Sequence, residues 1–246
     1  MLKIENLSGG YLSVPVLHEV SFSVGDGELV GLIGLNGAGK STTINEIIGL
    51  LEPYTGSITI DGKSLLDDPK IYRQKIGYIP ESPQLYEELT LQEHLDTMIM
   101  AYKLERDTTL AQAQQLLQLF RLEDKLDWLP TQFSKGMKQK VMIIQALLVQ
   151  PRLLIVDEPF LGLDPLAIAD LIDLLATEKQ RGTAILMSTH VLDSAEKMCD
   201  RFVILHHGRV RAQGTLAELQ KEFNQPEADL ATIYRLLTQR DREDAK

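Results

Sequence analysis

One short stretch constrains the fold of this chain more than any other feature. Residues 34–42 read GLNGAGKST, which matches the pattern G-x-x-x-x-G-K-S. The apolar run 29–33 before it is typical of a buried parallel strand, and the apolar spacing of residues 41–51 after it is typical of a helix. A glycine-rich turn from strand to helix points unpaired backbone N–H groups and the positive end of the helix dipole at one place, which favours a polyphosphate. The sequence therefore predicts an α/β fold built around a phosphate-binding loop.

The residue types in this loop suit that chemistry. Glycines let the backbone wrap a phosphate where a Cβ would clash. We expect the Lys40 ammonium to reach the β- and γ-phosphates of a nucleotide and the Ser41 hydroxyl to ligate Mg²⁺. The other loop positions expected at the nucleotide are Gly34, Asn36, Gly37, Ala38, Gly39 and Thr42.

The composition is that of an ordinary globular protein. The 246 residues suffice for one large or two small domains. A formal net charge of −10 argues against nucleic acid as a partner, because nucleic-acid binders usually present a basic face. The single cysteine, Cys199, permits no internal disulfide, and no apolar run approaches the ~18 residues needed to cross a bilayer. We therefore expect a cytoplasmic chain, with any membrane part supplied by a separate protein.

The predicted elements change character twice along the chain. An antiparallel β region gives way to a helical insert over residues 82–150, and an α/β order then returns. We expect one domain over residues 1–220 that contains this insert, and a short, charged helical extension over 221–246 whose last residues, 240–246, fray. The expected strands lie within 1–27 and at 56–63, 75–79, 153–156, 184–188, 202–205 and 209–211. The expected helices are 90–102, 108–120, 134–149 and one that Asp164 caps.

Two acidic residues follow the buried strand 153–156. A carboxylate at the carboxyl end of such a strand lies where ligands bind in an open α/β sheet. Asp157 is expected to hold Mg²⁺, directly or through water, and Glu158 to polarise the water that attacks a γ-phosphate. His190 follows the buried strand 184–188, and we expect it to donate to the γ-phosphate and hold the attacking water. The remaining histidines are expected at the solvated surface: His18, His94, His206 and His207.

A second helix start also has the chemistry of an anion site. Ser134 is placed to cap the helix that follows it, and Gly136 lies in its first turn. A second phosphate-seeking helix in one chain is explained if it completes the nucleotide site of another copy. The sequence thus predicts a head-to-tail, two-fold dimer with two shared sites.

Along nearly its whole length the chain resembles an ABC-type ATPase. GLNGAGKST resembles the Walker A loop, LLIVDE resembles Walker B with its catalytic glutamate, and FSKGMKQK stands where the family has its signature, commonly LSGGQ. Residues 162–164 resemble the D-loop, His190 resembles the switch histidine, and Tyr11 occupies the place of the aromatic residue that stacks on adenine. The stretches FSKGMKQK, DEPFLGLDPLAI and IGYIPE resemble those of the ATP-binding subunits of Ecs-type exporters.

This resemblance implies a P-loop fold of the ABC ATPase type, with a mostly parallel core sheet, an antiparallel β subdomain and a helical insert. It implies ATP and Mg²⁺ as ligands and a second copy, or a paralogous ATPase, as a partner. Ser134 and Gly136 of one copy would close on the γ-phosphate held by Lys40 of the other. Closure would drive a separate multi-span permease at the inner face of the cell membrane, contacted by the region after Glu81 and by the helical insert. Export of peptides or other hydrophobic molecules is the implied role.

Three positions depart from the family pattern. Glu81 stands where the family has its Q-loop glutamine; a carboxylate still binds Mg²⁺, but when ionised it cannot donate a hydrogen bond. Gln84 lies nearby as an alternative. In the signature, Lys135 replaces a glycine and Met137 replaces a glutamine, so Lys135 either adds a cation near the partner's γ-phosphate or reaches solvent.

Two other classes of function compete with a transport ATPase. A non-transport ABC ATPase acting on ribosomes or DNA tends to carry two cassettes, long coiled coils or zinc modules, whereas this chain has one cassette, one cysteine and no long heptad segment. A GTPase would carry an Asn-Lys-x-Asp motif, which this sequence lacks, and would give Glu158 and the signature no role.

Overall fold

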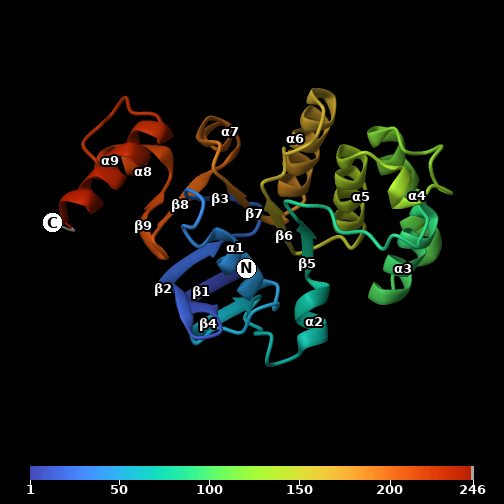
Figure 1. Cartoon of the computed structure of the whole chain (residues 1–246), viewed down its shortest axis with the longest axis horizontal. Coiled ribbons are helices and arrows are strands. Elements are labelled where there is room, and N and C mark those ends of the chain that lie inside the picture. The colour runs from blue at the N-terminus through green and yellow to red at the C-terminus, as the bar shows by residue number, and fades with distance from the viewer. Residues whose placement is uncertain (245–246) are drawn as a thin grey trace.

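The computed structural model describes the backbone of residues 1–244 and the side chains of residues 1–239. Its centre is a six-stranded sheet of order β5-β6-β7-β3-β8-β9, in which every neighbouring pair is parallel except β8 and β9 (Figure 1). Three of these strands, β3, β6 and β7, are buried at every position. The strands are β3 (Leu29–Ile33), β5 (Ile76–Ile79), β6 (Leu153–Asp157), β7 (Ala184–Thr189), β8 (Arg201–His206) and β9 (Arg209–Gly214).

A smaller antiparallel sheet of order β2-β1-β4 lies below the core sheet in Figure 1. Its strands are β1 (Leu2–Tyr11), β2 (Val14–Val24) and β4 (Thr55–Ile60). Helix α1 (Lys40–Ile47) lies between the two sheets and shares one apolar cluster with both. The predicted fold class, a mostly parallel core sheet with an antiparallel β region and helices, is confirmed.

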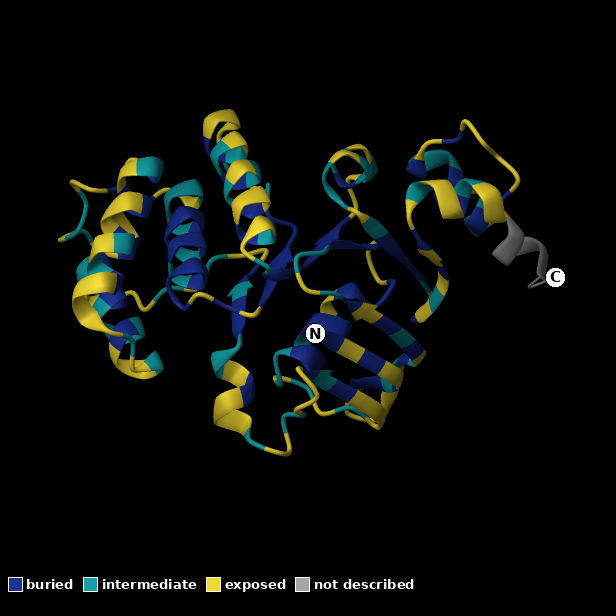
Figure 2. Ribbon diagram, turned by 180° about the vertical axis from the view of Figure 1, so that it is seen from behind, coloured by how far each residue is buried: buried dark blue, intermediate teal, exposed yellow. Residues whose placement is uncertain are grey.

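The core sheet is buried on both faces because consecutive residues of its strands point to opposite sides. In β6, Leu153 and Ile155 join the cluster with α1 and the antiparallel sheet. Leu154 and Val156 join a second cluster, formed with the helices on the other face. Figure 2 shows the result as a dark, buried sheet with exposed residues on the outer faces of the helices.

The helical part of the chain lies at one end of the molecule (Figure 1). Its helices are α3 (Leu91–Tyr102), α4 (Arg106–Phe120) and α5 (Lys135–Leu148), with a short 3₁₀ turn at Pro130–Gln132. The capping box predicted at Thr90 and Glu93 is present at α3. Helix α4 begins two residues before the predicted start, because the Glu105 carboxylate accepts hydrogen bonds from the N–H groups of Asp107 and Thr108.

Helix α6 (Pro165–Gln180) begins at its predicted Asp164 cap. Two short helices were not predicted, α2 (Pro69–Gln74) and α7 (Leu192–Met198). The start of α2 carried a readable signal, an Asp68 cap followed by proline, whereas α7 has no side-chain cap.

The expectation that His94 is solvated is wrong. The residue is buried, its Nε2 accepts a hydrogen bond from the Tyr86 N–H, and its Nδ1 lies 2.8 Å from the Thr90 carbonyl oxygen. The loop that contains Tyr86 precedes the helix in the sequence, so the helical spacing of α3 could not predict that His94 is buried.

The chain ends in helices α8 (Leu216–Glu222) and α9 (Leu230–Asp244), which with α7 form a third apolar cluster on β3 and β8. The domain boundary expected after residue 220 falls inside α8, and the segment after it packs against the core sheet through Leu230, Ile233 and Leu237. Fraying was expected for residues 240–246; the backbone of this stretch is helical through Asp244, and residues 245–246 lie outside the described part of the chain. No helix in the described part of the chain is both long and apolar enough to cross a membrane.

Candidate functional site

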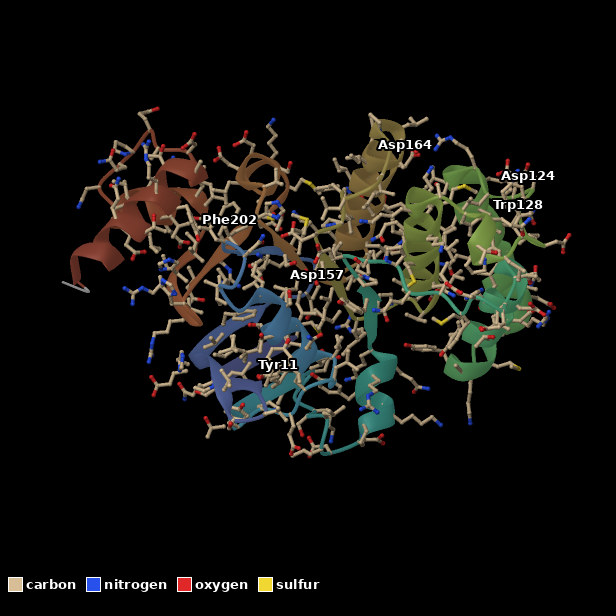
Figure 3. The ribbon with its side chains drawn as sticks, in the orientation of Figure 1. Tyr11, Asp124, Trp128, Asp157, Asp164 and Phe202 are labelled. Carbon is tan, nitrogen blue, oxygen red and sulfur yellow. The ribbon has the colours of Figure 1, made fainter. Side chains whose placement is uncertain are left out.

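Three loops meet at one edge of the core sheet. They follow β6, β7 and β3, which are consecutive in the sheet, and parallel strands bring their carboxyl ends to the same edge. The pairing register sets Asp157 opposite Ser188 and Ile33 opposite Thr189. Residues far apart in the sequence therefore reach one place, near the Asp157 label at the centre of Figure 3.

The phosphate-binding loop runs from β3 into α1 as predicted. Gly39 stands just before α1 with φ 109°, a conformation that favours glycine, and a Cβ there would lie 2.7 Å from the Leu17 side chain. The loop is tied to the β8–β9 turn, since the Gly208 N–H donates to the Ala38 carbonyl oxygen. Lys40 is buried, and its ammonium donates to the Gly34 carbonyl oxygen at 2.7 Å.

A charged network joins the three loops. The Lys40 Nζ lies 3.8 Å from Oε1 of Glu158, and the same oxygen lies 2.8 Å from Nδ1 of His190. Glu158 has φ 47°, which is uncommon for a residue other than glycine, and its N–H donates to the Ser188 carbonyl oxygen. The carboxylate expected to act on water is thus held between a cation and an imidazole.

Of the two acidic residues at the carboxyl end of β6, Asp157 is the less exposed, at 6% against 8% for Glu158. Burial raises its pKa, and the neighbouring Glu81 and Glu158 carboxylates raise it further, against a hydrogen bond from Ser188 and the charge of Lys40. The Ser188 hydroxyl donates directly to an Asp157 carboxylate oxygen. Sequence reasoning missed Ser188, although its place at the end of the neighbouring buried strand was a usable signal.

The donor set around Asp157 fits a divalent cation. The Ser41 hydroxyl, the Asp157 carboxylate and the Glu81 carboxylate line one cavity, and hard oxygen donors are the ligands that Mg²⁺ prefers. Among the described side chains, those of residues 1–239, no group of three or more His, Cys, Asp or Glu is arranged to hold a metal alone. Mg²⁺ is commonly bound by one or two carboxylates together with substrate phosphates and waters, which is the arrangement these residues suit.

A cavity of about 530 Å³ lies over the loop. Tyr11 stands at its rim, half exposed, with its hydroxyl accepting a hydrogen bond from the Asn45 side chain. Gln84, considered as a substitute for Glu81, is exposed and does not line the cavity. The predicted residues that do line it are Tyr11, Asn36, Gly37, Gly39, Lys40, Ser41, Thr42, Glu81, Asp157, Glu158 and His190. Gly34 and Ala38 lie behind them, buried.

Ser134 and Gly136 do not join this cavity. Ser134 is exposed and caps α5 through the Met137 N–H. A Cβ on Gly136 would lie 2.5 Å from the Gly162 carbonyl oxygen, so α5 begins in close contact with the loop before α6. A buried bond from the Gln139 side chain to the Pro80 carbonyl oxygen ties α5 to the segment that carries Glu81.

Comparison with known proteins gives a consistent result. Residues 17–161 match the family model described as ABC transporter. The chain is 54% identical to the ABC-type transporter ATP-binding protein EcsA of Bacillus subtilis (strain 168), over 98% of each chain. It is 37% identical to the Nod factor export ATP-binding protein I of Rhizobium meliloti, over 87% of this chain and 64% of that protein.

Solved structures give the same assignment. One described as the ATP-binding subunit of an ABC transporter superposes with a TM-score of 0.94 at 54% identity, covering 97% of this chain and 99% of that chain. A dimeric ATP-binding cassette in a post-hydrolysis state, bound to ADP and Pi, superposes with a TM-score of 0.79 at 28% identity, covering 88% and 99%. The resemblance of the motifs to the ABC family is confirmed, and the chain belongs to the ABC transporter family as an ATP-binding cassette.

Proposed function

We propose that this chain hydrolyses ATP as a subunit of an exporter and drives a separate membrane permease. One observation carries the proposal: Lys40, Glu158 and His190, from three different loops, form one contact network on the wall of a cavity that also holds Asp157 and Ser41. A cation for phosphate, a base for water and oxygen ligands for Mg²⁺ are the parts that phosphoryl transfer to water needs.

The roles follow from these contacts. Lys40 exchanges its contacts with Gly34 and Glu158 for the β- and γ-phosphates, while the backbone N–H groups of the loop bind the remaining phosphate oxygens. Ser41 and Asp157, with Glu81 as a further candidate ligand, would hold Mg²⁺, which would supply charge neutralisation at the phosphates.

Hydrolysis is a transfer of the γ-phosphoryl group to water. Glu158 accepts a proton from the water whose oxygen attacks the γ-phosphorus, and the bond to the bridging oxygen breaks to leave ADP. His190, fixed by its contact with Glu158, orients that water and donates to the γ-phosphate. Tyr11 stacks on the adenine at the rim of the cavity.

A second copy, or a paralogous ATPase, completes each site. The exposure of Ser134 and its distance from the cavity of its own chain support this, because its hydroxyl and the Gly136 backbone are then available to a γ-phosphate on a partner. The dimeric state of the similar cassette bound to ADP and Pi supports the same arrangement.

The permease contact is proposed at a groove of about 270 Å³ between β5, α3 and α5. Arg73, Met98, Tyr102 and Met142 line it. The bond from Gln139 to Pro80 links this groove's α5 to the segment bearing Glu81, so a change at the nucleotide can reach the groove. Such a contact holds the chain at the inner face of the cell membrane. The export direction rests on relatives such as the Nod factor export protein.

Two experiments test the proposal. The purified chain is expected to release phosphate from MgATP, and absence of turnover at any chain concentration would contradict the ATPase assignment. A tagged chain purified in mild detergent is expected to bring down a multi-span membrane protein in stoichiometric amount. Recovery of ribosomes or DNA-repair proteins in its place would favour a non-transport ABC ATPase.

A further inference from the structure

The C-terminal helix α9 reaches back to the phosphate-binding loop. The Leu35 backbone N–H donates a hydrogen bond to the Tyr234 hydroxyl oxygen at 3.1 Å, across 199 positions of sequence. Tyr234 is 7% exposed, whereas Leu35 is 58% exposed, so a buried side chain binds an exposed part of the loop. Resting on the proposed function, we infer that Tyr234 is a positioning residue that holds the tip of this loop in its nucleotide-binding shape.

The phenol is held firmly because α9 is part of a core cluster. Leu230, Ile233 and Leu237 of α9 are buried with Ile33 and Phe202 of the core sheet. Ile33 is the last residue of β3 and lies two positions before Leu35. One helix therefore packs against the strand that ends at the loop and also binds the loop itself.

The first turn of α9 is anchored to the segment after His190. The Leu230 N–H donates to a carboxylate oxygen of Glu196 at 2.6 Å. Glu196 lies on α7 (Leu192–Met198), which begins two residues after His190. Contacts between described residues thus run without a gap from the His190 loop, through α7 and α9, to the phosphate-binding loop.

This arrangement has a thermodynamic consequence for binding. The loop tip from Leu35 to Gly37 is exposed in the single chain, so hydrogen bonds such as the one from Leu35 to Tyr234 contribute more to its ordering than side-chain packing does. If ordering is lost, the binding-competent population falls, and the apparent affinity falls by the same factor for every nucleotide that uses the loop. The chemical step in the bound state should be unaffected, because the Tyr234 hydroxyl binds the loop at Leu35, whereas the residues proposed to act on water are Glu158 and His190.

The test is Tyr234→Phe, with Tyr72→Phe as a matched control. Tyr72 is also a buried tyrosine whose hydroxyl binds the backbone, donating to the Ile47 carbonyl oxygen at 2.8 Å, but it lies on α2, and Ile47 is at the end of α1 away from the phosphate-binding loop. For Tyr234→Phe we expect the Kd of both ADP and ATP to rise about 2- to 10-fold, the range for one net hydrogen bond. The kcat at saturating ATP should stay within about twofold, following from unchanged bound-state chemistry.

Hydrogen exchange of the nucleotide-free protein gives an independent readout. Amides of residues 34–39 should exchange faster in Tyr234→Phe and at the wild-type rate in Tyr72→Phe. Glu196→Ala removes the bond to the first turn of α9, so it should raise the Kd and speed the exchange of residues 34–39 by a smaller amount. This variant replaces Tyr234→Phe in the test if Tyr234→Phe does not fold.

The inference is overturned if Tyr234→Phe lowers thermal stability while leaving Kd and loop exchange unchanged, or if Tyr72→Phe weakens nucleotide as strongly. These results are separable from the proposed function. A wild-type chain that binds ADP but never turns over ATP refutes the ATPase proposal, yet ADP affinity and loop exchange still decide the role of Tyr234.

Discussion

The loop before α1 and the cap of α5 are both helix starts suited to an anion, but their surroundings differ. The first is built into the sheet edge: Lys40 is buried and shares a network with Glu158 and His190. The second is open, with Ser134 exposed and engaged only in capping its own helix among the described bonds. Under the proposed function, the contrast means that one half of a nucleotide site would be assembled within the chain, whereas the other half would be presented to a second copy. The predictions below probe that contrast, beginning with the largest effect.

Glu158→Gln removes the proposed proton acceptor and keeps the shape of the side chain. We expect turnover to fall by about 10²- to 10⁴-fold, the range for general-base catalysis, while ATP binding persists and an ATP-bound dimer accumulates. Phosphate release and size-exclusion chromatography with ATP measure the two effects. Glu222→Gln, an exposed substitution on α8, is the control and should match wild type. Near-normal hydrolysis by Glu158→Gln would remove this residue from the chemistry.

Lys40→Ala tests whether the preassembled half binds nucleotide by itself. Loss of one partner from a desolvated charge pair costs about 2–5 kcal/mol, so ATP affinity should fall at least ~30-fold. Equilibrium binding of a fluorescent ATP analogue checks this. Lys3→Ala on the solvated face of β1 provides a charge-matched control. Unchanged affinity in Lys40→Ala would place the nucleotide elsewhere.

Tyr11→Ala tests the rim of the same cavity, where the chain offers an aromatic face. Loss of base stacking should weaken ATP by about 1–3 kcal/mol, if the stacking resembles that measured for nucleic-acid bases. Tyr11→Phe retains the ring and loses only the bond from Asn45, so it should bind nearly as well as wild type. Equal weakening by both substitutions would assign the effect to the hydroxyl.

Glu46 is a buried acid on α1 that lies outside the nucleotide cavity, so it is expected to affect stability and not nucleotide binding. It lies at the far end of α1 against Gly9, neither carboxyl oxygen has a hydrogen-bond partner among the described residues, and burial raises its pKa to about 7. The unfolded chain loses this proton near the ordinary value of 4.5, so the free energy of unfolding should fall as the pH rises from 4.5 to 7.

The expected size of this loss is about 1–3 kcal/mol after allowance for solvent screening. Denaturant unfolding at several pH values measures it, and Glu46→Gln should flatten that part of the profile without changing nucleotide affinity. A profile that Glu46→Gln leaves unaltered would show that the Glu46 carboxyl is ionised in the folded protein at little cost.

Local patterns were enough for much of this molecule. The strand–loop–helix at residues 29–47 and the strand ending at Asp157 follow from short apolar runs, glycines and acids that act within a few residues. The helix caps at Thr90 and Asp164 were readable for the same reason. These features depend on residues that are close together in the sequence, so the sequence alone is enough to predict them.

Features set by tertiary packing could not be read in this way. The contact between Glu158 and His190 depends on β6 and β7 being neighbours in register, which no local pattern states. The bond from Leu35 to Tyr234 depends on α9 folding back over the end of β3. Burial of Glu46 reflects the close approach of α1 to Gly9, and its sequence position within a helix predicts only a polar residue.

The most direct test of the shared-site account mixes two inactive chains. Lys40→Ala disables the built-in half, and Gly136→Asp disables the presented half, because a side chain at Gly136 meets the Gly162 carbonyl oxygen. If sites form between copies, each mixed dimer holds one site with both halves intact. Random mixing then makes about half the dimers heterodimeric and restores about one quarter of wild-type turnover. If each chain hydrolyses ATP on its own, mixing will add no turnover to the average of the two variants measured separately, and the account of a site shared between copies will be wrong.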